Sequence, residues 1–508
     1  MSRQHLRKRK NRLGFADHVS SGRSFRLGEC HAMKILGYIG VAFVTIQLAC
    51  ASAAWSENRP NLILFVADDQ SVFDYGSYGN MAVPTPATDR FAKESLVFDC
   101  AFTGQAICAP SRSMLYTGLY PVRNGCFINH TEIRSGVKTL PVYLKALGYD
   151  VILAGKSHVN PLDQFPWTEW FRPQEQEGMP RPGLPFRQMG SFFEQVDGPF
   201  CMVVASEYPH GPFFDKSSHD PEGVKLEPFR SQTTQERRVN ARYYANIEEG
   251  EGEFSKVLAL LEEHSLVDDT VVVYTADHGM FRGKFTVYHS GLRVPLMVRW
   301  PDRISPGRSS TLVSLADILP TFVALAKGAV PRDLDGRNIL SVWQGRSEEG
   351  HAFVYGVGES QGIQDRSLFP QRSISDGRYN YIYNFNSLER LKRDQKAGVE
   401  IDYFRSRDAR RFAHRAEEEL YDLASDPYEL TNIAGRKEVA LVQSQLRREL
   451  FRWMEQQGDY LTPRGALPYF KPKMHPMDQP NPRFKYHVPD ELIGSLEEDY
   501  VDAHALTQ

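Results

Sequence analysis

The sequence predicts an α/β fold with a large mixed, mostly parallel sheet sandwiched by helices, followed by a smaller C-terminal α+β domain. Two observations predict it. Short continuous apolar runs recur along the first 300 residues, and segments with apolar residues at three-and-four spacing separate them. Uninterrupted apolar runs are typical of strands buried on both faces, as in parallel sheets. Strands that alternate with helices are typical of doubly wound folds.

The predicted elements follow from these patterns in order. Five apolar runs predict strands of the sheet, at residues 61–67, 149–154, 199–206, 270–276 and 294–298. Apolar residues at helical spacing predict helices over residues 139–147, 248–264 and 312–325. Between them, residues 159–190 are rich in Pro, Gln, Trp and Gly and predict a long loop.

The pattern changes near residue 350. Short strand-like pieces occur at residues 351–355, 371–375 and 379–383, and an amphipathic helix is predicted over residues 441–454. The sequence therefore predicts four parts: a basic arm plus signal peptide (1–54), a large domain that holds the candidate site (55–345), a smaller α+β subdomain (346–475) and a polar tail (476–508).

The N-terminus has the pattern of an export signal. Residues 34–54 begin with one Lys, continue as an apolar stretch and end in small residues, which is typical of a secretory signal peptide. The stretch is too short for a spanning helix, so no stable membrane insertion is expected after cleavage. We expect a secreted or periplasmic protein. Two alternatives stay open: a lipoprotein anchored at Cys50, which Gln47 disfavours, and a buried apolar helix.

Composition excludes some functions. The 508 residues are 41% hydrophobic and 24% charged, which is ordinary for a globular protein, and the net charge of -3 gives no sign of nucleic-acid binding. Six cysteines are present, of which four remain after cleavage of the signal. Four cysteines in a domain of this size do not form a disulfide scaffold, and their pairing stays open.

Polar residues directly follow several predicted strands. In doubly wound sheets, functional residues gather at the carboxyl ends of the strands. Adjacent carboxylates repel each other unless a cation or a basic group offsets them. Each residue could alone be a solvated turn or a helix cap, but together they predict a site at one edge of the sheet: Asp68, Asp69, Lys156, His158, His210, Asp277 and His278.

Residues 108–118 read C-A-P-S-R-S-M-L-Y-T-G. This segment resembles the hallmark of the type I sulfatases of the alkaline phosphatase superfamily, C-x-P-S-R followed by x-x-L-x-T-G. The resemblance extends from about residue 58 to 460 and implies an alkaline phosphatase-like fold. It implies that a formylglycine-generating maturation enzyme oxidises Cys108 to formylglycine, whose hydrated aldehyde attacks sulfur. The alternative is a buried or disulfide-bonded cysteine beside a turn.

The resemblance also implies a metal site. Its ligands are the modified Cys108 with the residues that follow two strands: Asp68, Asp69, Asp277 and His278. One divalent cation is expected, with Ca²⁺ as first choice. Sulfatases more often have Asn where His278 stands, and imidazole suits transition metals better than Ca²⁺. Mn²⁺ and Mg²⁺ are therefore alternatives.

The remaining roles are implied in the same way. Arg112 would hold the formylglycine oxygens and support the metal carboxylates. Lys156 would neutralise sulfate charge, and His158 would contact the formylglycine. His210, in P-H-G-P-F, and Lys284, in R-G-K-F, would bind the bridging ester oxygen, with His210 as general acid.

The predicted function is a sulfuric-ester hydrolase. The G-K-S-H-V-N-P stretch is similar to sulfamidase-like members, so the expected substrate is a sulfated sugar or polysaccharide, as an O- or N-sulfate. One rival is a phosphonate or phosphodiester hydrolase that uses the same nucleophile, which His278 favours. Another is a non-catalytic binding protein in which Cys108 is never modified.

Overall fold

The computed structural model describes residues 59–360, 368–385 and 415–459, together with residues 387, 389, 392, 393, 396 and 461. The predicted signal peptide and the predicted tail lie outside these residues. Within the described ranges, no helix has the length and apolar character needed to cross a membrane. The four cysteines in these ranges, at positions 100, 108, 126 and 201, are free thiols.

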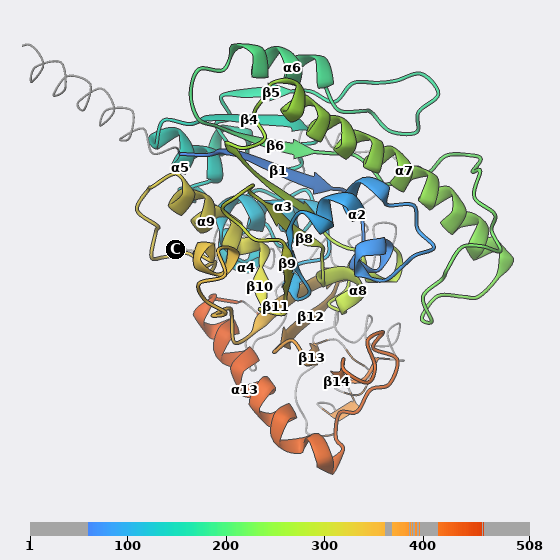
Figure 1. Ribbon diagram of the computed structural model, residues 1–508. Coiled ribbons are helices and arrows are strands. Elements are labelled where there is room, and N and C mark those ends of the chain that lie inside the picture. The colour runs from blue at the N-terminus through green and yellow to red at the C-terminus, as the bar shows by residue number, and fades with distance from the viewer. Residues whose placement is uncertain are drawn as a thin grey trace, which may run out of the picture. The chain divides into compact units, whose positions relative to one another are not determined.

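A mixed sheet of eight strands lies at the centre of the fold, in the order β5-β4-β6-β1-β7-β8-β2-β9 (Figure 1). Pairing is parallel from β5 to β7, whereas β8 runs antiparallel to both β7 and β2. This confirms the predicted fold class. The strands are β1 (Asn61–Ala67), β2 (Leu96–Phe98), β4 (Asp150–Gly155), β5 (Glu169–Phe171), β6 (Phe200–Ala205), β7 (Thr270–Ala276), β8 (Leu296–Arg299) and β9 (Gly307–Ser309).

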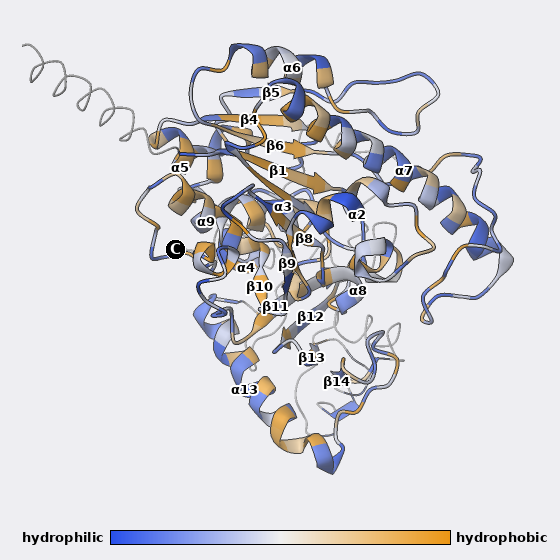
Figure 2. Ribbon diagram, viewed as in Figure 1, coloured by the Kyte–Doolittle hydropathy of each residue, from blue (hydrophilic) through white to orange (hydrophobic). Residues whose placement is uncertain are grey.

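Both faces of the sheet are covered. Successive side chains of a strand point to opposite faces, and those of β1 divide accordingly between two cores. On the side of Leu62 and Leu64, the core includes α5 (Leu140–Ala146) and α9 (Ile318–Leu325). On the side of Ile63, it includes α2 (Pro86–Lys93), α6 (Phe186–Gln195) and α7 (Thr234–Glu263). The central strands are accordingly mostly hydrophobic (Figure 2).

A smaller antiparallel sheet and one long helix follow. The sheet consists of β11 (Val354–Ser360), β12 (Leu368–Ser375), β13 (Tyr379–Asn384) and β14 (Glu418–Asp422), and the helix is α13 (Ala440–Gln456). They share a third core with Met114 of α3 (Cys108–Thr117), so the C-terminal part packs against the helix that begins with Cys108. This confirms an α+β C-terminal part, whereas the predicted boundaries at 345 and 475 stay predictions.

Short elements complete the described fold. A two-stranded parallel sheet pairs β3 (Ala101–Phe102) with β10 (Val313–Ser314). The remaining helices are α4 (Pro121–Asn124), α8 (His289–Leu292), α10 (Leu340–Trp343) and six 3-10 turns, η1 (Val72–Asp74), η2 (Gly76–Tyr78), η3 (Leu162–Gln164), η4 (Phe281–Gly283), η5 (Leu315–Asp317) and η6 (Lys437–Val439).

Three predicted elements are corrected by the structure. The helix predicted over residues 248–264 begins at Thr234, where Thr233 caps it by accepting the Glu236 N–H. The helix predicted over residues 312–325 begins only at Ile318, because Ser314 and Asp317 form a capping box after β10. Residues 159–190 are not one loop, since they contain β5 and the start of α6.

The parallel strands end together at one edge of the sheet. Four of them, β1, β4, β6 and β7, are adjacent in the sheet and are followed by predicted site residues. At the end of β4, Gly155 has a φ of 98°, and a Cβ there would lie 2.1 Å from the Ala205 carbonyl oxygen. Glycine is therefore required where the chain turns towards Lys156.

Candidate active site

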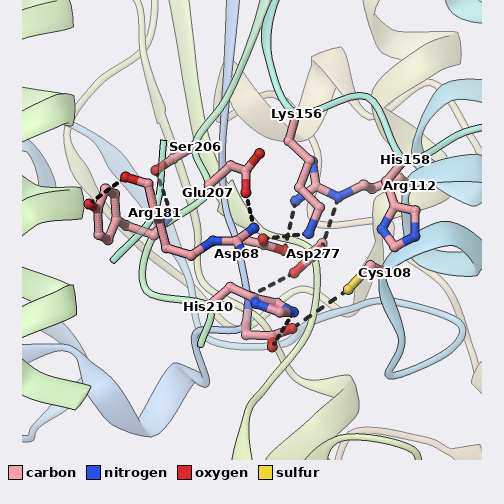
Figure 3. Close-up of polar contacts among 12 residues, drawn as sticks. Asp68, Cys108, Arg112, Lys156, His158, Arg181, Ser206, Glu207, His210 and Asp277 are labelled. Atoms are coloured by element: carbon pink, nitrogen blue, oxygen red, sulfur yellow. Dashed lines mark hydrogen bonds and ion pairs between the residues drawn. The ribbon is translucent and has the colours of Figure 1, made fainter. Parts of the chain in front are cut away.

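The structure brings the predicted site residues together at this edge of the sheet. Asp68 and Asp69 follow β1, Lys156 and His158 follow β4, and His210 follows β6. Asp277 and His278 follow β7, while Lys284 directly follows η4. Cys108 and Arg112 come from the first turns of α3. Figure 3 shows several of these side chains pointing towards one another.

Arg112 links the two strand ends that carry the carboxylates. Its side chain is fully buried, with Nε 3.0 Å from Asp277 Oδ2 and Nη2 3.1 Å from Asp68 Oδ1. A guanidinium is suited to this task because its donors are fixed in one plane and it stays charged when buried. Removing it would take one counter-charge from each of two buried carboxylates. Arg112 is therefore the structural centre of the site.

Asp68 is held between two cations. Besides Arg112, Lys156 places its Nζ 2.5 Å from Asp68 Oδ2. Burial raises the pKa of the Asp68 carboxyl, but Lys156, His210 and Arg112 together lower it well below its usual range. Asp68 is therefore a carboxylate whose oxygens face these basic groups.

Four side chains form a group with the geometry of a metal site. One ligand atom from each of Asp69, Cys108, Asp277 and His278 lies within 4.8 Å of the others, and all four residues are buried. His278 Nδ1 lies 2.9 Å from the Gly279 carbonyl, to which it can donate, so that Nε2 carries the lone pair and faces the group. Asp68, the fifth predicted ligand, lies beside this group and is bonded to Arg112 and Lys156.

The charges in this group fit a divalent cation. Burial raises the pKa of Asp277 to about 6, although His278 and Arg112 lower it. Burial lowers the pKa of His278, but Asp277 and Asp69 outweigh it and raise this pKa to about 9. The carboxylates thus attract positive charge to the Nε2 position, which lies 3.1 Å from Asp69 Oδ1. Without a cation, a proton on Nε2 supplies this positive charge. A cation ligated by Nε2 would replace that proton.

Cys108 lies where a nucleophile would be activated. It is the first residue of α3, and the N-terminus of a helix favours negative charge. Burial raises the pKa of its thiol, but Lys156, Lys284 and His278 lower it well below its usual range. Its Sγ lies 3.4 Å from His278 Nε2 and 3.8 Å from Asp69 Oδ1.

His210 and Lys284 lie together beside Asp69 Oδ2, whereas His278 and Cys108 lie beside Asp69 Oδ1. His210 Nε2 is 3.5 Å from Asp69 Oδ2 and 3.4 Å from Lys284 Nζ, and Lys284 Nζ is 2.6 Å from the same carboxylate oxygen. Burial lowers the pKa of His210, but Asp69 and Asp68 raise it above its ordinary value. A raised pKa favours the protonated form of this histidine, which is the form that acts as a general acid.

His130 is a site residue that the sequence analysis missed. Its Nδ1 lies 3.0 Å from His158 Nε2, and its Nε2 lies 3.0 Å from Asn129 Nδ2. The Oδ1 of Asn129 accepts the backbone N–H of Ala109, the residue after Cys108, which fixes the orientation of the amide. No strand end or motif marks His130, so only the structure reveals it.

These contacts determine where the protons lie. Asn129 Nδ2 can only donate, so His130 Nε2 accepts, and neutral His130 carries its proton on Nδ1. That proton is donated to His158 Nε2, so neutral His158 carries its own proton on Nδ1. Burial and Lys156 lower the pKa of His158 to about 4, although Cys108 raises it. His158 is therefore a neutral donor beside Cys108.

A second pair that the sequence analysis missed joins Arg181 and Glu207, which Figure 3 shows together with the site residues. Arg181, from the segment predicted as a loop, forms an ion pair with Glu207, which lies three residues before His210. The Tyr208 hydroxyl donates to the Arg181 carbonyl at 3.0 Å. Because residues 159–190 have no periodicity, nothing in the sequence pointed to Arg181.

The fold and the grouping of these side chains at one edge of the sheet are those expected of a hydrolase, and comparison with known families agrees. Residues 60–329 match the sulfatase family, and residues 276–392 match the C-terminal region of N-sulphoglucosamine sulphohydrolases. The chain belongs to the sulfatase family and is a sulfatase enzyme. Membership implies a metal ion and a formylglycine, for which the four-residue group and Cys108 are suited.

Two curated relatives are similar over most of their length. An ulvan-active sulfatase of Formosa agariphila is 41% identical over 459 residues, which cover 89% of this chain and 91% of the relative. Human N-sulphoglucosamine sulphohydrolase is 28% identical over 494 residues, covering 83% and 95%.

Solved structures share the fold. That of BT4656 in complex with its substrate D-glucosamine-2-N,6-O-disulfate has a TM-score of 0.62 at 21% identity, covering 80% of this chain and 100% of that chain. The phosphonate monoester hydrolase of Agrobacterium radiobacter has a TM-score of 0.62 at 18% identity, covering 78% and 96%. At these identities the likeness concerns the fold alone.

Proposed function

We propose that this sulfatase removes sulfate from a sulfated sugar or polysaccharide, as an O- or N-sulfate, through a formylglycine at position 108. The observation that carries the proposal is the convergence of Cys108, the metal-type group and the His210–Lys284 pair at one buried edge of the sheet. The names of the relatives support a sugar substrate, since one acts on ulvan and another on N-sulphoglucosamine.

The nucleophile would come from a modification. Oxidation of Cys108 to formylglycine by a maturation enzyme supplies a hydrated aldehyde, in which one hydroxyl oxygen attacks sulfur and the other later expels sulfate by re-forming the carbonyl. His158 donates from Nδ1 to an oxygen at position 108 and so fixes its orientation. Arg112 keeps the neighbouring carboxylates ionised and in place.

The remaining residues bind the sulfate group and its leaving oxygen. Lys156 lies next to Asp68 and presents its positive charge to the non-bridging sulfate oxygens. His210 donates a proton to the bridging oxygen as its bond to sulfur breaks, so that the sugar leaves as an alcohol. Lys284, beside His210, stabilises negative charge on the same oxygen.

The metal would be held by Asp69, Asp277, His278 and the modified residue 108, with Asp68 as a further ligand once Lys156 turns to the substrate. A divalent cation supplies charge that polarises the sulfate oxygens. We propose Ca²⁺ because most of these ligand atoms are oxygens, and Mn²⁺ or Mg²⁺ as alternatives because His278 supplies nitrogen.

We also propose that the protein is exported. The support is the segment at residues 34–54, with its single Lys, apolar stretch and small residues before Ala54. After cleavage the mature chain would be secreted or periplasmic, without stable membrane insertion. The measurement is N-terminal sequencing of the mature protein from its host, where an N-terminus near Ala53 is expected and a lipid-modified Cys50 would contradict cleavage there.

Mass spectrometry of the tryptic peptide that contains residue 108 tests the nucleophile. Protein from the native host should show a loss of about 18 Da relative to cysteine, which corresponds to formylglycine. A panel of sulfated saccharides and small aryl sulfates then tests the substrate. Turnover of aryl sulfates alone would contradict a sugar substrate. An unmodified Cys108 in inactive protein would favour a non-catalytic binding protein.

A phosphonate or phosphodiester hydrolase is the second candidate, because His278 supplies nitrogen to the metal-type group. The values of kcat/KM for matched sulfate monoesters and phosphate diesters separate the two activities. We expect sulfate esters to be preferred. A dominant phosphodiesterase activity would overturn the proposed function.

A further inference from the structure

The helix α7 lies against the segment that carries His210. At Gly250 the approach is so close that a Cβ there would lie 3.3 Å from the Tyr208 Cβ. About one turn earlier on the helix, Asn246 is fully buried. Burial of an asparagine amide is unfavourable unless its donors and its acceptor are paired. The partners of Asn246 therefore indicate what this residue does.

Asn246 makes three hydrogen bonds to the loop that begins with His210. Its Nδ2 donates to the His210 carbonyl at 3.1 Å and to the Pro212 carbonyl at 3.2 Å, while its Oδ1 accepts the Phe214 N–H at 3.1 Å. The amide can form this set in one orientation only, because its nitrogen donates and its oxygen accepts. One side chain of α7 thus fixes the backbone on both sides of Gly211.

The backbone fixed in this way orients the imidazole of His210. His210 Nδ1 is hydrogen-bonded to the carbonyl of Gly211, the residue whose two neighbours Asn246 holds. A carbonyl oxygen only accepts, so Nδ1 carries a proton there, and Nε2 is the nitrogen that faces Lys284 and Asp69. A proton on Nε2 is consequently the one that His210 can donate to a substrate.

The same helix also holds the carboxylate that His210 contacts. Tyr243, about one turn before Asn246, is fully buried and donates its hydroxyl to the Asp69 carbonyl at 2.9 Å. Asp69 has a φ of 65°, which is uncommon for a residue other than glycine and is kept only when the surroundings support it. Its Oδ2 lies 3.5 Å from His210 Nε2. Both partners of this contact are therefore attached to one helix.

We infer that Asn246 is a positioning residue for the sulfatase reaction, because it holds His210 so that the proton on Nε2 points at the bridging oxygen of the substrate. Transfer of that proton accompanies cleavage of the bond between sulfur and this oxygen, and it leaves His210 neutral with its other proton on Nδ1. Asn246 acts through the loop and not by contact with the substrate. This inference rests on the proposed role of His210 as general acid and adds the residue that orients it.

Aryl sulfates that differ only in the leaving phenol test the inference. Protonation of the bridging oxygen matters little for 4-nitrophenyl sulfate, whose phenol leaves easily, and much more for 4-methoxyphenyl sulfate, whose phenol is more basic. Asn246→Asp keeps the shape of the side chain and an acceptor for the Phe214 N–H, but it removes both donors to the loop carbonyls. It should lower kcat/KM for 4-methoxyphenyl sulfate about tenfold more than kcat/KM for 4-nitrophenyl sulfate. Equal losses on the two sulfates, or no loss on either, would overturn the inference.

Arg242→Met is the matched control. Arg242 lies on the same helix and donates to the carbonyls of Phe213 and Phe214, so it holds the same loop at a point beyond His210. This variant should change kcat/KM for both sulfates by the same factor. A loss in Arg242→Met that depends on the leaving phenol would contradict a specific role of Asn246. Asn246→Ala, which also lacks both donors, takes the place of Asn246→Asp if that variant does not fold.

Crystal structures of the wild type and the variants separate this inference from the proposed function. If protein with formylglycine at position 108 hydrolyses neither aryl sulfates nor sulfated sugars, the proposed function fails, and the position of His210 then decides the inference. A His210 ring that turns away from Asp69 in Asn246→Asp but stays in place in Arg242→Met would support it. A ring that keeps its wild-type position in Asn246→Asp would overturn it.

Discussion

His130 Nδ1 lies 3.0 Å from His158 Nε2, and this contact determines which nitrogen of His158 faces the nucleophile. The Ala109 N–H fixes the orientation of the Asn129 amide. Asn129 therefore donates to His130 Nε2, and His130 Nδ1 donates to His158 Nε2. The backbone beside Cys108 and the imidazole that contacts residue 108 are thus connected by hydrogen bonds. His130 is a positioning residue in this scheme.

Replacing His130 by alanine should lower kcat about tenfold, since a lost hydrogen bond of about 1.4 kcal/mol corresponds to that factor. His130→Gln can still donate an amide N–H to His158 and should recover most of the activity. Steady-state kinetics of the two variants, with thermal unfolding as a control, check this. Equal activity of the two variants would argue for a purely structural role.

Replacing Arg112 by methionine should lower the free energy of unfolding by about 3–5 kcal/mol, because Asp277 and Asp68 each lose a buried counter-charge. Arg378→Met is a matched control, since its ion pair with Asp422 is exposed and its loss should change the stability little. Urea unfolding measures both. Similar losses in the two variants would contradict the central role of Arg112.

Stability should depend on pH through Glu253. This buried residue accepts from Leu184 N–H and the Ser206 hydroxyl, and burial raises its pKa from 4.5 to about 7 although these bonds lower it. The raised pKa means that the protonated form is favoured in the fold. Its stabilising contribution is complete below pH 4.5 and is lost as pH rises through about 7.

Glu253→Gln removes this titration while keeping the shape of the side chain. Relative to the variant, the wild type should lose about 2–3 kcal/mol of unfolding free energy between about pH 5 and about pH 8. Chemical denaturation gives the difference in unfolding free energy between the wild type and the variant at each pH. If this difference is the same at both pH values, Glu253 does not titrate in this range.

The choice of metal should depend on His278. Chelation should abolish activity, and added Ca²⁺ should restore it. His278→Asn replaces a nitrogen ligand by an oxygen ligand, so it should weaken Mn²⁺ binding about tenfold while Ca²⁺ still binds. Calorimetric titration of the metal-free protein with each ion measures this. A larger loss of Ca²⁺ binding than of Mn²⁺ binding would contradict this prediction, because it would show that the His278 nitrogen contributes more to Ca²⁺ binding.

Much of the fold follows from local pattern. The predicted strands at residues 61–67 and 270–276 have the bounds found in the structure, because both are buried on both faces and bounded by polar residues. The first half of α7 was missed because its buried residues include polar ones. Tyr243, for example, packs in an apolar cluster with Val83 and Ile247 and also donates its hydroxyl to the Asp69 carbonyl at 2.9 Å.

The site was predictable where residues follow strands and where the motif around Cys108 is present. Site residues that are linked only by contacts in the folded chain were not predictable. His130 lies 28 residues before His158 and Arg181 lies 26 residues before Glu207, and neither has a sequence pattern that links it to its partner. β5 was missed because three residues are too short to show periodicity.

The burial of Cys108 sets an order of events during synthesis. The residue is 2% exposed, and its helix packs through Met114 on a core that contains residues as late as Leu461. If an enzyme oxidises Cys108, as proposed above, it needs the segment before those later residues have been made and have packed around it. Under that proposal the oxidation of Cys108 and the folding of the chain would compete in time, and slower completion of the C-terminal core should raise the fraction of modified protein.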